Sequence, residues 1–273
     1  MSAPELTSSR NPTVQWVRAL ARAKARREAG VAVAEGVKAV SELLPLAGHV
    51  SHLFWCAGDG ARPEVAELAA EFTARGVAVT QVAGNVMAAM ADTRTPQGVL
   101  AVARVAPAPL KDILGRAGDV LVLDRVQDPG NVGTLLRTVE AVGGAGVVLL
   151  PGCADPTGPK AVRAAAASLF RVPYVAWHDS AAELADALTG AGLPLAVATA
   201  EGNPPDAALL GLPRVAWALG SEGHGVSQEL AAHADRNVAI PMAGDIDSLN
   251  VAVAGSVLLY ARALAGSPGG KSG

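Results

Sequence analysis

Short apolar segments alternate with helical stretches along the C-terminal part of the chain, and this alternation constrains the fold more than any other feature. The segment Val120-Leu121-Val122-Leu123 has no polar face, as expected of a strand that is buried on both sides. Strands of this kind, separated by helices, predict a parallel sheet and an α/β fold class. The expected strands lie near residues 120–125, 146–150, 172–177, 194–199, 215–220 and 238–242.

Polar and glycine residues gather where three of these strands end. Residues 128–137 read Asp-Pro-Gly-Asn-Val-Gly-Thr-Leu-Leu-Arg, and residues 219–225 read Leu-Gly-Ser-Glu-Gly-His-Gly. Residues 240–250 begin with Ile-Pro-Met-Ala-Gly and end with Ser-Leu-Asn. Ligands of open α/β sheets bind beyond the carboxyl ends of the strands. We therefore expect the three segments to form one pocket.

The first part of the chain predicts a second, smaller α/β domain over residues 11–105. Its expected strands lie near 31–34, 53–57, 77–82 and 99–105, with helices near 37–46, 63–75 and 85–91. Residues 1–10 are small, polar and without periodicity, so we expect a disordered tail. Residues 106–118 begin with Ala-Pro-Ala-Pro and are expected to form a stiff linker, and residues 119–273 form the larger domain.

A basic segment opens the smaller domain. Residues 11–28 predict one helix, because the leading Asn-Pro pair is typical of an N-cap and a first helical position. Arg18, Arg22 and Arg26 recur there every four residues and would line one face. This ridge is either a phosphate-binding surface or a solvated helix face, and the sequence leaves both open. A net charge of −3 argues against an indiscriminate nucleic-acid binder but allows a local basic patch.

The cysteines and the hydropathy pattern limit the other possibilities. Cys56 and Cys153 are far apart and isolated, so we expect neither a disulfide nor a metal site. No apolar stretch is long and uninterrupted enough to span a bilayer, and no cleavable leader opens the chain. We therefore expect a cytoplasmic protein that has no membrane partner.

The three polar segments, in this order, resemble the signature motifs of the SpoU/TrmH family of RNA ribose 2′-O-methyltransferases, within the SPOUT superfamily. The first places Asn131, Gly133 and Arg137 at the spacing of the family; the second has Gly-Ser-Glu-Gly-x-Gly; the third has Ile-Pro-Met followed by Ser-Leu-Asn. In residues 33–40 and 96–102 the smaller domain resembles the family's ribosomal-protein-like RNA-binding domain.

The resemblance implies several properties of the whole protein. The larger domain would be a SPOUT methyltransferase domain with a trefoil knot, and S-adenosylmethionine would be the cofactor. No metal is required, because this sulfonium cofactor already carries an activated methyl group. The site of the family is completed across a homodimer, so part of the last helix would be interface as well as core. Its expected interface residues are Val253, Val257, Leu258 and Tyr260.

The motifs and the charge pattern together give the candidate site residues. The candidate catalytic residues are Asn131, Arg137, Glu222, Ser248 and Asn250. The candidate cofactor-binding residues are Leu219, Gly220, Ser221, Gly225, Ile240, Met242 and Leu249, and Gly244 is expected to expose main chain beside them. The candidate RNA-binding residues are Arg18, Arg22, Arg26, Lys160 and Arg163.

Four of these residues carry specific expectations. Asn131 should cap the helix that carries Arg137, with both side chains on the same side of the helix start. The resemblance implies that Arg137 helps to deprotonate the ribose 2′-hydroxyl. Because a guanidinium stays protonated, we favour a phosphate clamp that also stabilises the developing alkoxide. Glu222 would orient Arg137 or a substrate hydroxyl, or else complement a helix dipole. Ser248 is also of the type that caps a helix.

The substrate and the activity have alternatives. Ribosomal RNA is favoured because the N-terminal extension resembles that of rRNA-modifying members, but shorter relatives act on transfer RNA. A catalytically inactive RNA-binding protein of the same fold is a second alternative. A nicotinamide enzyme would need Gly-x-Gly-x-x-Gly directly after its first strand, and neither half of the chain has that order. Ala165 and Ala167 depart from the family pattern, which weakens the case for RNA contact by that helix.

Overall fold

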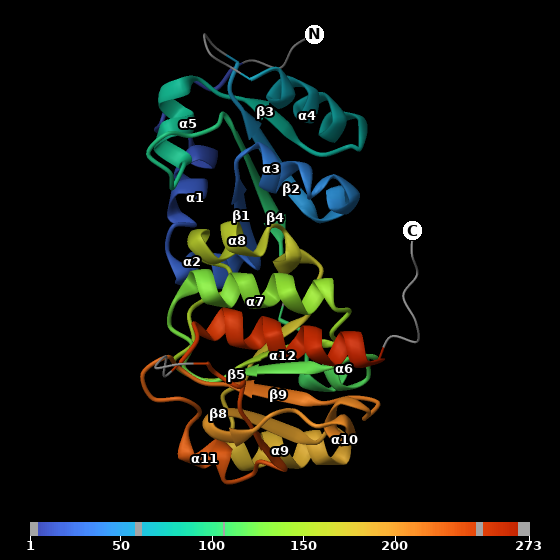
Figure 1. The fold of residues 1–273 in the computed structure, drawn as a ribbon. Helices are drawn as coiled ribbons and strands as arrows, with labels where there is room; N and C mark the ends of the chain where they lie inside the picture. Colours follow the sequence, from blue (N-terminus) through green and yellow to red (C-terminus); the bar gives the residue numbers. More distant parts are fainter. Residues whose placement is uncertain (1–4, 58–61, 106, 244–247, 267–273) are drawn as a thin grey trace. The chain divides into compact units, whose positions relative to one another are not determined.

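The computed structural model describes residues 5–57, 62–105, 107–243 and 248–266 (Figure 1). The chain forms two compact units. Unit 1 contains Met1–Ala106 and Asp155–Phe170, and unit 2 contains Pro107–Ala154 and Arg171–Gly273. The sequence placed residues 155–170 in the larger domain, whereas their contacts group them with the N-terminal part of the chain. Among the described residues, no helix is both long enough and apolar enough to cross a membrane.

Unit 1 is built on a four-stranded mixed sheet in the order β1-β4-β2-β3. Strand β4 is antiparallel to β1 and β2, and β2 is parallel to β3. The strands are β1 (Val31–Glu35), β2 (Val50–Trp55), β3 (Val79–Gln81) and β4 (Val99–Arg104). The helices are α1 (Pro12–Ala19), α2 (Ala23–Ala29), α3 (Val37–Ser41), η1 (Leu44–His49), α4 (Pro63–Ala74), α5 (Gly84–Met90), α8 (Pro159–Ala165) and η2 (Ser168–Phe170). The central strand β4 is buried from Val99 to Ala103, which explains its apolar sequence.

The prediction of one helix over residues 11–28 is wrong. Asn11 does cap α1, since its side chain accepts a hydrogen bond from the Thr13 amide at 2.9 Å. The helix ends at Ala19, however, and α2 begins only at Ala23. The Arg26 guanidinium donates hydrogen bonds to the backbone carbonyls of Leu20 and Ala21. These side-chain hydrogen bonds stabilise the break between the two helices. The arginine ridge is therefore not formed.

The N-terminal tail is only partly within the described residues, because residues 1–4 lie outside them. Leu6 donates a backbone hydrogen bond to Gln81 of β3 at 2.9 Å and accepts one from Ala83 at the same distance. Residue 6 thus extends the edge of the sheet, where the sequence had suggested a disordered tail. Its apolar side chain packs partly buried against the core of unit 1, which supplies the physical reason.

Unit 2 confirms the parallel sheet and the α/β class. Its six strands follow the order β10-β8-β9-β5-β6-β7, and each neighbouring pair is parallel. The strands are β5 (Val120–Leu123), β6 (Gly146–Leu149), β7 (Tyr174–Ala176), β8 (Leu195–Asn203), β9 (Ala216–Leu219) and β10 (Arg236–Val238). The helices are α6 (Leu110–Leu114), α7 (Pro129–Ala141), α9 (Ala181–Gly190), α10 (Ala207–Leu210), α11 (Gln228–Ala231) and α12 (Val251–Gly266). The trefoil knot stays a prediction.

The centre of this sheet positions the site. Strands β5 and β9 are buried along their full length and pair in register, with Leu123 opposite Leu219 at their carboxyl ends. Helices α7 and α12 lie along one side of the sheet, and α9 lies on the other (Figure 1). The segments 128–137 and 219–225 therefore leave the sheet at the same edge, as the strand-end argument requires.

Candidate active site

A buried carboxylate at the end of β5 fixes the neighbouring loop. Asp124 is 3% exposed and follows the apolar strand directly. Its backbone amide donates to the Leu219 carbonyl at 2.8 Å, and its Oδ2 accepts from the Ser227 amide at 2.6 Å. Asp124 thereby holds both ends of the segment between β9 and α11 against β5. Asp124 is not among the candidate site residues, although an acid directly after a fully apolar strand is a signal that the sequence contains.

The segment after β9 closes on itself in a tight hairpin. The Ser221 amide donates to the Gly225 carbonyl at 3.1 Å, and the Gly225 amide donates to the Ser221 carbonyl at 2.8 Å. Gly225 has a φ of +63°, and a Cβ on Gly220 would lie 1.9 Å from the Gly225 carbonyl carbon. Only glycine permits so close an approach at residue 220. The hairpin places Glu222 at its exposed tip.

The start of α7 differs from the expectation. The N-cap is Asp128, whose Oδ1 accepts from the Gly130 amide at 2.6 Å and from the Asn131 amide at 3.1 Å. Pro129 takes the first helical position, which suits a residue with a fixed φ and no amide proton. The prediction that Asn131 caps this helix is therefore wrong. Because Asp128 does so, the side-chain amide of Asn131 is available for a tertiary contact.

Asn131, Glu222 and Asn250 form what we call the amide–carboxylate cluster. The Glu222 Oε1 atom accepts from Asn131 Nδ2 at 2.8 Å and from Asn250 Nδ2 at 2.9 Å. Asn250 Nδ2 also lies 3.1 Å from Asn131 Oδ1. One residue comes from each of the three polar segments, so these segments do converge. Asn250, not Ser248, also caps α12, because its Oδ1 accepts from the Ala252 amide at 2.9 Å.

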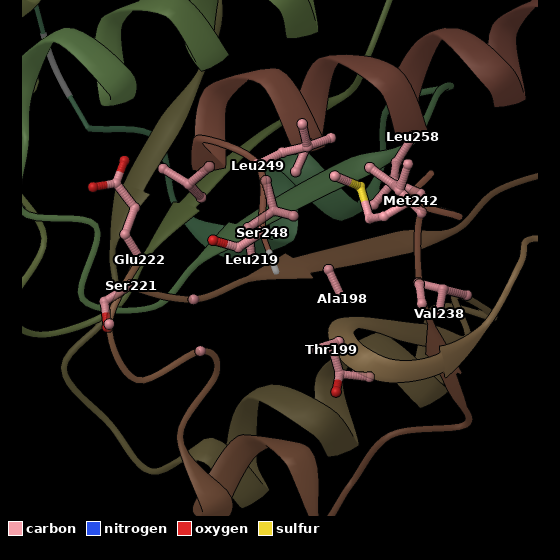
Figure 2. Close-up of a pocket in the computed structure, with 18 residues that line it drawn as sticks. Ala198, Thr199, Leu219, Ser221, Glu222, Val238, Met242, Ser248, Leu249 and Leu258 are labelled. Carbon is pink, nitrogen blue, oxygen red and sulfur yellow. The ribbon is translucent and has the colours of Figure 1, made fainter. Parts of the chain in front are cut away.

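A cavity of about 260 Å³ opens beside the cluster (Figure 2). All seven candidate cofactor-binding residues line it, together with Ser248 and Glu222. Figure 2 shows Glu222 and Ser221 at one side and Val238 and Met242 at the other. Further residues, which were not among the candidate cofactor ligands, also line the cavity: Ala198, Thr199, Ala200, Gly223, Val238, Ala239, Val251, Ala254 and Leu258. Gly244 lies outside the described residues.

The comparisons with known proteins agree with this site. Residues 119–260 match the model of the SpoU rRNA Methylase family, and residues 11–101 match that of the MRM3-like substrate binding domain. The chain belongs to the SpoU methylase family. The matched residues include the whole amide–carboxylate cluster and every candidate cofactor-binding residue.

Several SpoU relatives resemble the chain over almost its full length. The 23S rRNA (guanosine(2553)-2′-O)-methyltransferase RlmP of Bacillus subtilis is 31% identical, over 94% of this chain and 98% of its own. The 23S rRNA (uridine(2479)-2′-O)-methyltransferase of Streptomyces viridochromogenes is also 31% identical, over 95% and 91%. The AdoMet-bound structure of an rRNA methyltransferase from Sinorhizobium meliloti superposes with a TM-score of 0.80 at 31% identity, covering 95% of this chain and 97% of that one.

Arg137, the candidate base or phosphate clamp of the SpoU motif, stands apart from the cluster. Its side chain is exposed on α7, and it makes no hydrogen bond or ion pair within the described part of the chain. Six helical residues separate it from Asn131 by about 9 Å along the axis and about 240° around it. The expectation that both side chains share one side is therefore wrong. Glu222 contacts Asn131 and Asn250 instead of Arg137.

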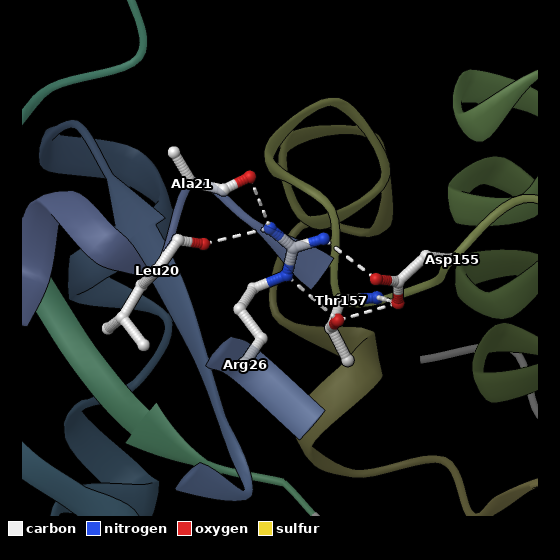
Figure 3. Close-up of polar contacts among 5 residues, drawn as sticks. All are labelled: Leu20, Ala21, Arg26, Asp155 and Thr157. Carbon is white, nitrogen blue, oxygen red and sulfur yellow. Dashed lines mark hydrogen bonds and ion pairs between the residues drawn. The ribbon is translucent and has the colours of Figure 1, made fainter. Parts of the chain in front are cut away.

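The candidate RNA-binding residues all lie in unit 1, and one of them is buried. Arg26 is only 4% exposed, and all three nitrogens of its guanidinium donate hydrogen bonds (Figure 3). It cannot bind phosphate without breaking these bonds, so its assignment as a surface ligand is corrected. Arg163 is exposed but pairs with Asp92 at 2.8 Å. Arg18, Arg22 and Lys160 are exposed, and their role in RNA binding stays a prediction.

The thiols do not contribute to the site. Both cysteines are free. Burial raises the pKa of Cys153 to about 11, so its thiol is protonated at neutral pH. Within the described residues, no group of three or more His, Cys, Asp or Glu side chains is arranged to hold a metal ion. Among the described residues that line the cavity, Glu222 supplies the carboxylate, and two side-chain amides hold it.

Proposed function

We propose that this SpoU family member transfers the methyl group of S-adenosylmethionine to a ribose 2′-hydroxyl of RNA, with ribosomal RNA as the substrate. The observation that carries the proposal is the amide–carboxylate cluster at the edge of the cavity lined by the cofactor motifs. Relatives that share almost the whole chain are named as 23S rRNA 2′-O-methyltransferases, which supports this substrate class.

The cavity beside the amide–carboxylate cluster, called the first or cofactor cavity below, has a lining that suits S-adenosylmethionine. Leu219, Met242 and Leu249 offer apolar surface to an adenine ring, while hydroxyls such as Ser221 and Thr199 offer partners for its polar atoms. The closely packed backbone of the hairpin after β9 leaves main-chain groups at the cavity wall. When bound, the cofactor supplies a methyl group already activated on a sulfonium.

Glu222 has the geometry of the residue that handles the hydroxyl proton. Its Oε1 is held by two amide donors, which leaves Oε2 to accept a hydrogen bond from the ribose 2′-hydroxyl. In the reaction the new bond joins the 2′-oxygen to the methyl carbon, and the carbon–sulfur bond breaks with its electrons on sulfur. The hydroxyl proton passes to the Glu222 carboxylate and then to water. Asn131 and Asn250 position the carboxylate, because each donates to its other oxygen.

A homodimer would complete this site. Helix α12 exposes Val253, Val257, Tyr260 and Leu264, which are 43–72% exposed, and such apolar surface marks interfaces. Arg137 lies on α7, which packs against α12. A pairing of two copies through this surface would bury the apolar side chains and bring Arg137 of one protomer towards the cluster of its partner. Light scattering should give twice the 27.4 kDa of one chain, and a monomer at assay concentrations would contradict the dimer.

The function is tested with RNA from cells that lack the gene. Purified protein, tritiated S-adenosylmethionine and either ribosomal or transfer RNA are incubated, and 2′-O-methyl marks are then mapped. We expect one ribose in ribosomal RNA to be labelled, with the same mark present in wild-type cells. Labelling of transfer RNA alone would move the substrate to the other class. Cofactor binding without methylation of either RNA would identify an RNA-binding protein that has lost turnover.

A further inference from the structure

A second cavity, of about 290 Å³, adjoins the amide–carboxylate cluster. Residues 125–128 and Asn131 form one part of its lining, and Ser221, Glu222, Gly223 and His224 form the other. It shares Ser221, Glu222, Gly223 and Val251 with the cofactor cavity. Glu222 thus borders both cavities. A group in the second cavity would reach the same carboxylate as a cofactor in the first.

The two cavities differ in chemical character. The first is lined largely by apolar side chains, among them Leu219, Met242 and Leu258. The polar lining of the second comprises the guanidinium of Arg125, the side-chain amides of Gln127 and Asn131, the imidazole of His224, the Ser221 hydroxyl and the carboxylates of Asp128 and Glu222. Its volume is close to the lower limit of the range for ligand pockets, about 300–1,000 Å³. A small polar cavity beside a reactive carboxylate is suited to a ribose and its phosphate.

Arg125 is held in place where a phosphate would lie. Its backbone is left-handed, with a φ of 56°, which is unusual for a residue with a side chain. Its Nε lies 3.2 Å from Oδ1 of buried Asp124, and its Nη2 lies 3.4 Å from the Gly225 carbonyl. The side chain is 40% exposed, so other guanidinium protons stay available to a ligand. Asp124 anchors this arginine and the loop that carries Glu222 together.

We propose that the second cavity binds the acceptor nucleotide and that Arg125 binds its phosphodiester. The proposal rests on the function proposed above and deepens it: donor and acceptor approach Glu222 from separate cavities. The phosphate contact within one protomer is thereby assigned to Arg125, which lies outside the three motifs. Arginine binds phosphate oxygens with charge-assisted, often paired, hydrogen bonds, which would set the 2′-hydroxyl relative to Glu222.

The test replaces Arg125 by asparagine in the full-length protein. Asparagine tolerates the left-handed backbone, so Arg125→Asn removes the charge and avoids new strain. Arg116→Ala is the matched control, since Arg116 is also exposed in unit 2 but precedes β5, whereas Arg125 follows it. For each protein we would measure S-adenosylmethionine affinity by calorimetry. Methyl transfer to ribosomal RNA from gene-deleted cells would be followed at several salt concentrations.

We expect Arg125→Asn to raise the KM for RNA about tenfold, as for the loss of a hydrogen bond between charged groups. The slope of log kcat/KM against log salt should become shallower by about 0.7–0.9, because one fewer counterion is released. S-adenosylmethionine affinity and thermal stability should match the wild type. Arg125→Lys should recover the salt slope with only part of the activity, and Arg116→Ala should behave as wild type.

Three outcomes would overturn the assignment. An unchanged KM and salt slope in Arg125→Asn, with an active wild type, would reject it and leave the proposed function intact. Lost cofactor affinity in both Arg125→Asn and Arg125→Lys would make Arg125 a support of the first cavity instead. A wild type that binds no S-adenosylmethionine and methylates no RNA would reject the proposed function, and the acceptor site with it.

Discussion

The hydrogen-bond network of Arg26 in unit 1 and the amide–carboxylate cluster in unit 2 contain similar polar groups but differ in burial. In unit 1 the Arg26 guanidinium donates to Thr157 Oγ1 at 3.0 Å, to Asp155 at 2.7 Å and to two backbone carbonyls (Figure 3). In unit 2 Glu222 is exposed, and only its Oε1 accepts hydrogen bonds from other described residues. A buried network whose members are all paired stabilises a fold. An exposed carboxylate held by one oxygen keeps the other for a substrate.

This difference in burial explains why the spacing of the basic residues gave a wrong prediction of an arginine ridge. Arg18, Arg22 and Arg26 are equally basic and evenly spaced, yet only Arg26 is buried. Its partners Asp155 and Thr157 lie about 130 residues away in the chain, and no local pattern links them. Burial of a guanidinium is tolerated only where its donors are satisfied. Whether each guanidinium donor has an acceptor can be read from the tertiary contacts but not from the residue types in the sequence.

The largest effect is expected from a substitution that breaks the amide–carboxylate cluster in unit 2. Glu222→Ala should lower kcat for methyl transfer by roughly 10²–10⁴-fold, because the proton acceptor and the partner of both amides are lost. The free energy of unfolding should change by less than about 0.5 kcal/mol, as for an exposed residue. Tritium transfer and urea denaturation measure the two quantities. Glu222→Gln keeps an acceptor oxygen but lacks the basic carboxylate, so full activity in that variant would refute proton transfer to Glu222.

The second-largest effect is expected from a substitution that breaks the hydrogen-bond network of Arg26 in unit 1. Arg26→Ala should lower the free energy of unfolding of this unit by about 3–5 kcal/mol, because Asp155 is left half-buried without its counter-charge. Hydrogen exchange of the β1 and β4 amides reports this unit, and the β5 amides provide an internal reference in unit 2. Arg22→Ala, which removes an exposed neighbour, should change stability by under about 0.5 kcal/mol. Equal effects of the two substitutions would mean that Arg26 is not structural.

The smallest effect concerns the pH dependence of the same network. Burial alone would raise the pKa of Asp155, but hydrogen bonds from Thr157 and Arg26 hold it below its ordinary value of about 3.9. Because the folded-state pKa is lowered, the stabilisation is present above about pH 4 and is lost as the pH falls through the folded-state value. Wild-type unit 1 should therefore lose stability on acidification below about pH 4 more steeply than Asp155→Asn. Parallel profiles from hydrogen exchange would contradict this.

The sequence predicted the α/β architecture of unit 2 well, and the reasons are local. An apolar strand such as residues 120–123 has to be buried on both faces, and regular alternation with helices makes the sheet parallel. The convergence of the three polar segments also followed, since parallel strands end at one edge. The cofactor motifs then gave seven residues that line one cavity.

The sequence could not assign the contacts within that edge. Asp128 rather than Asn131 caps α7, and Asn250 rather than Ser248 caps α12, because the competing residues are all suitable caps and only packing selects among them. Helix rotation, set by which face of α7 is buried, carries Arg137 away from Asn131. Asp124 and Arg125 gained their roles from a loop about 100 residues away.

The sequence by itself therefore determined the layers, the strand ends and the family, because these follow from hydrophobic periodicity and short motifs. The tertiary structure decided which polar side chains are consumed by the fold and which are left for chemistry. That distinction depends on whether a partner from a distant segment satisfies each hydrogen-bonding group, and burial makes an unsatisfied group costly. Arg26 found its partners and became structural, whereas Glu222 keeps an oxygen exposed beside two cavities.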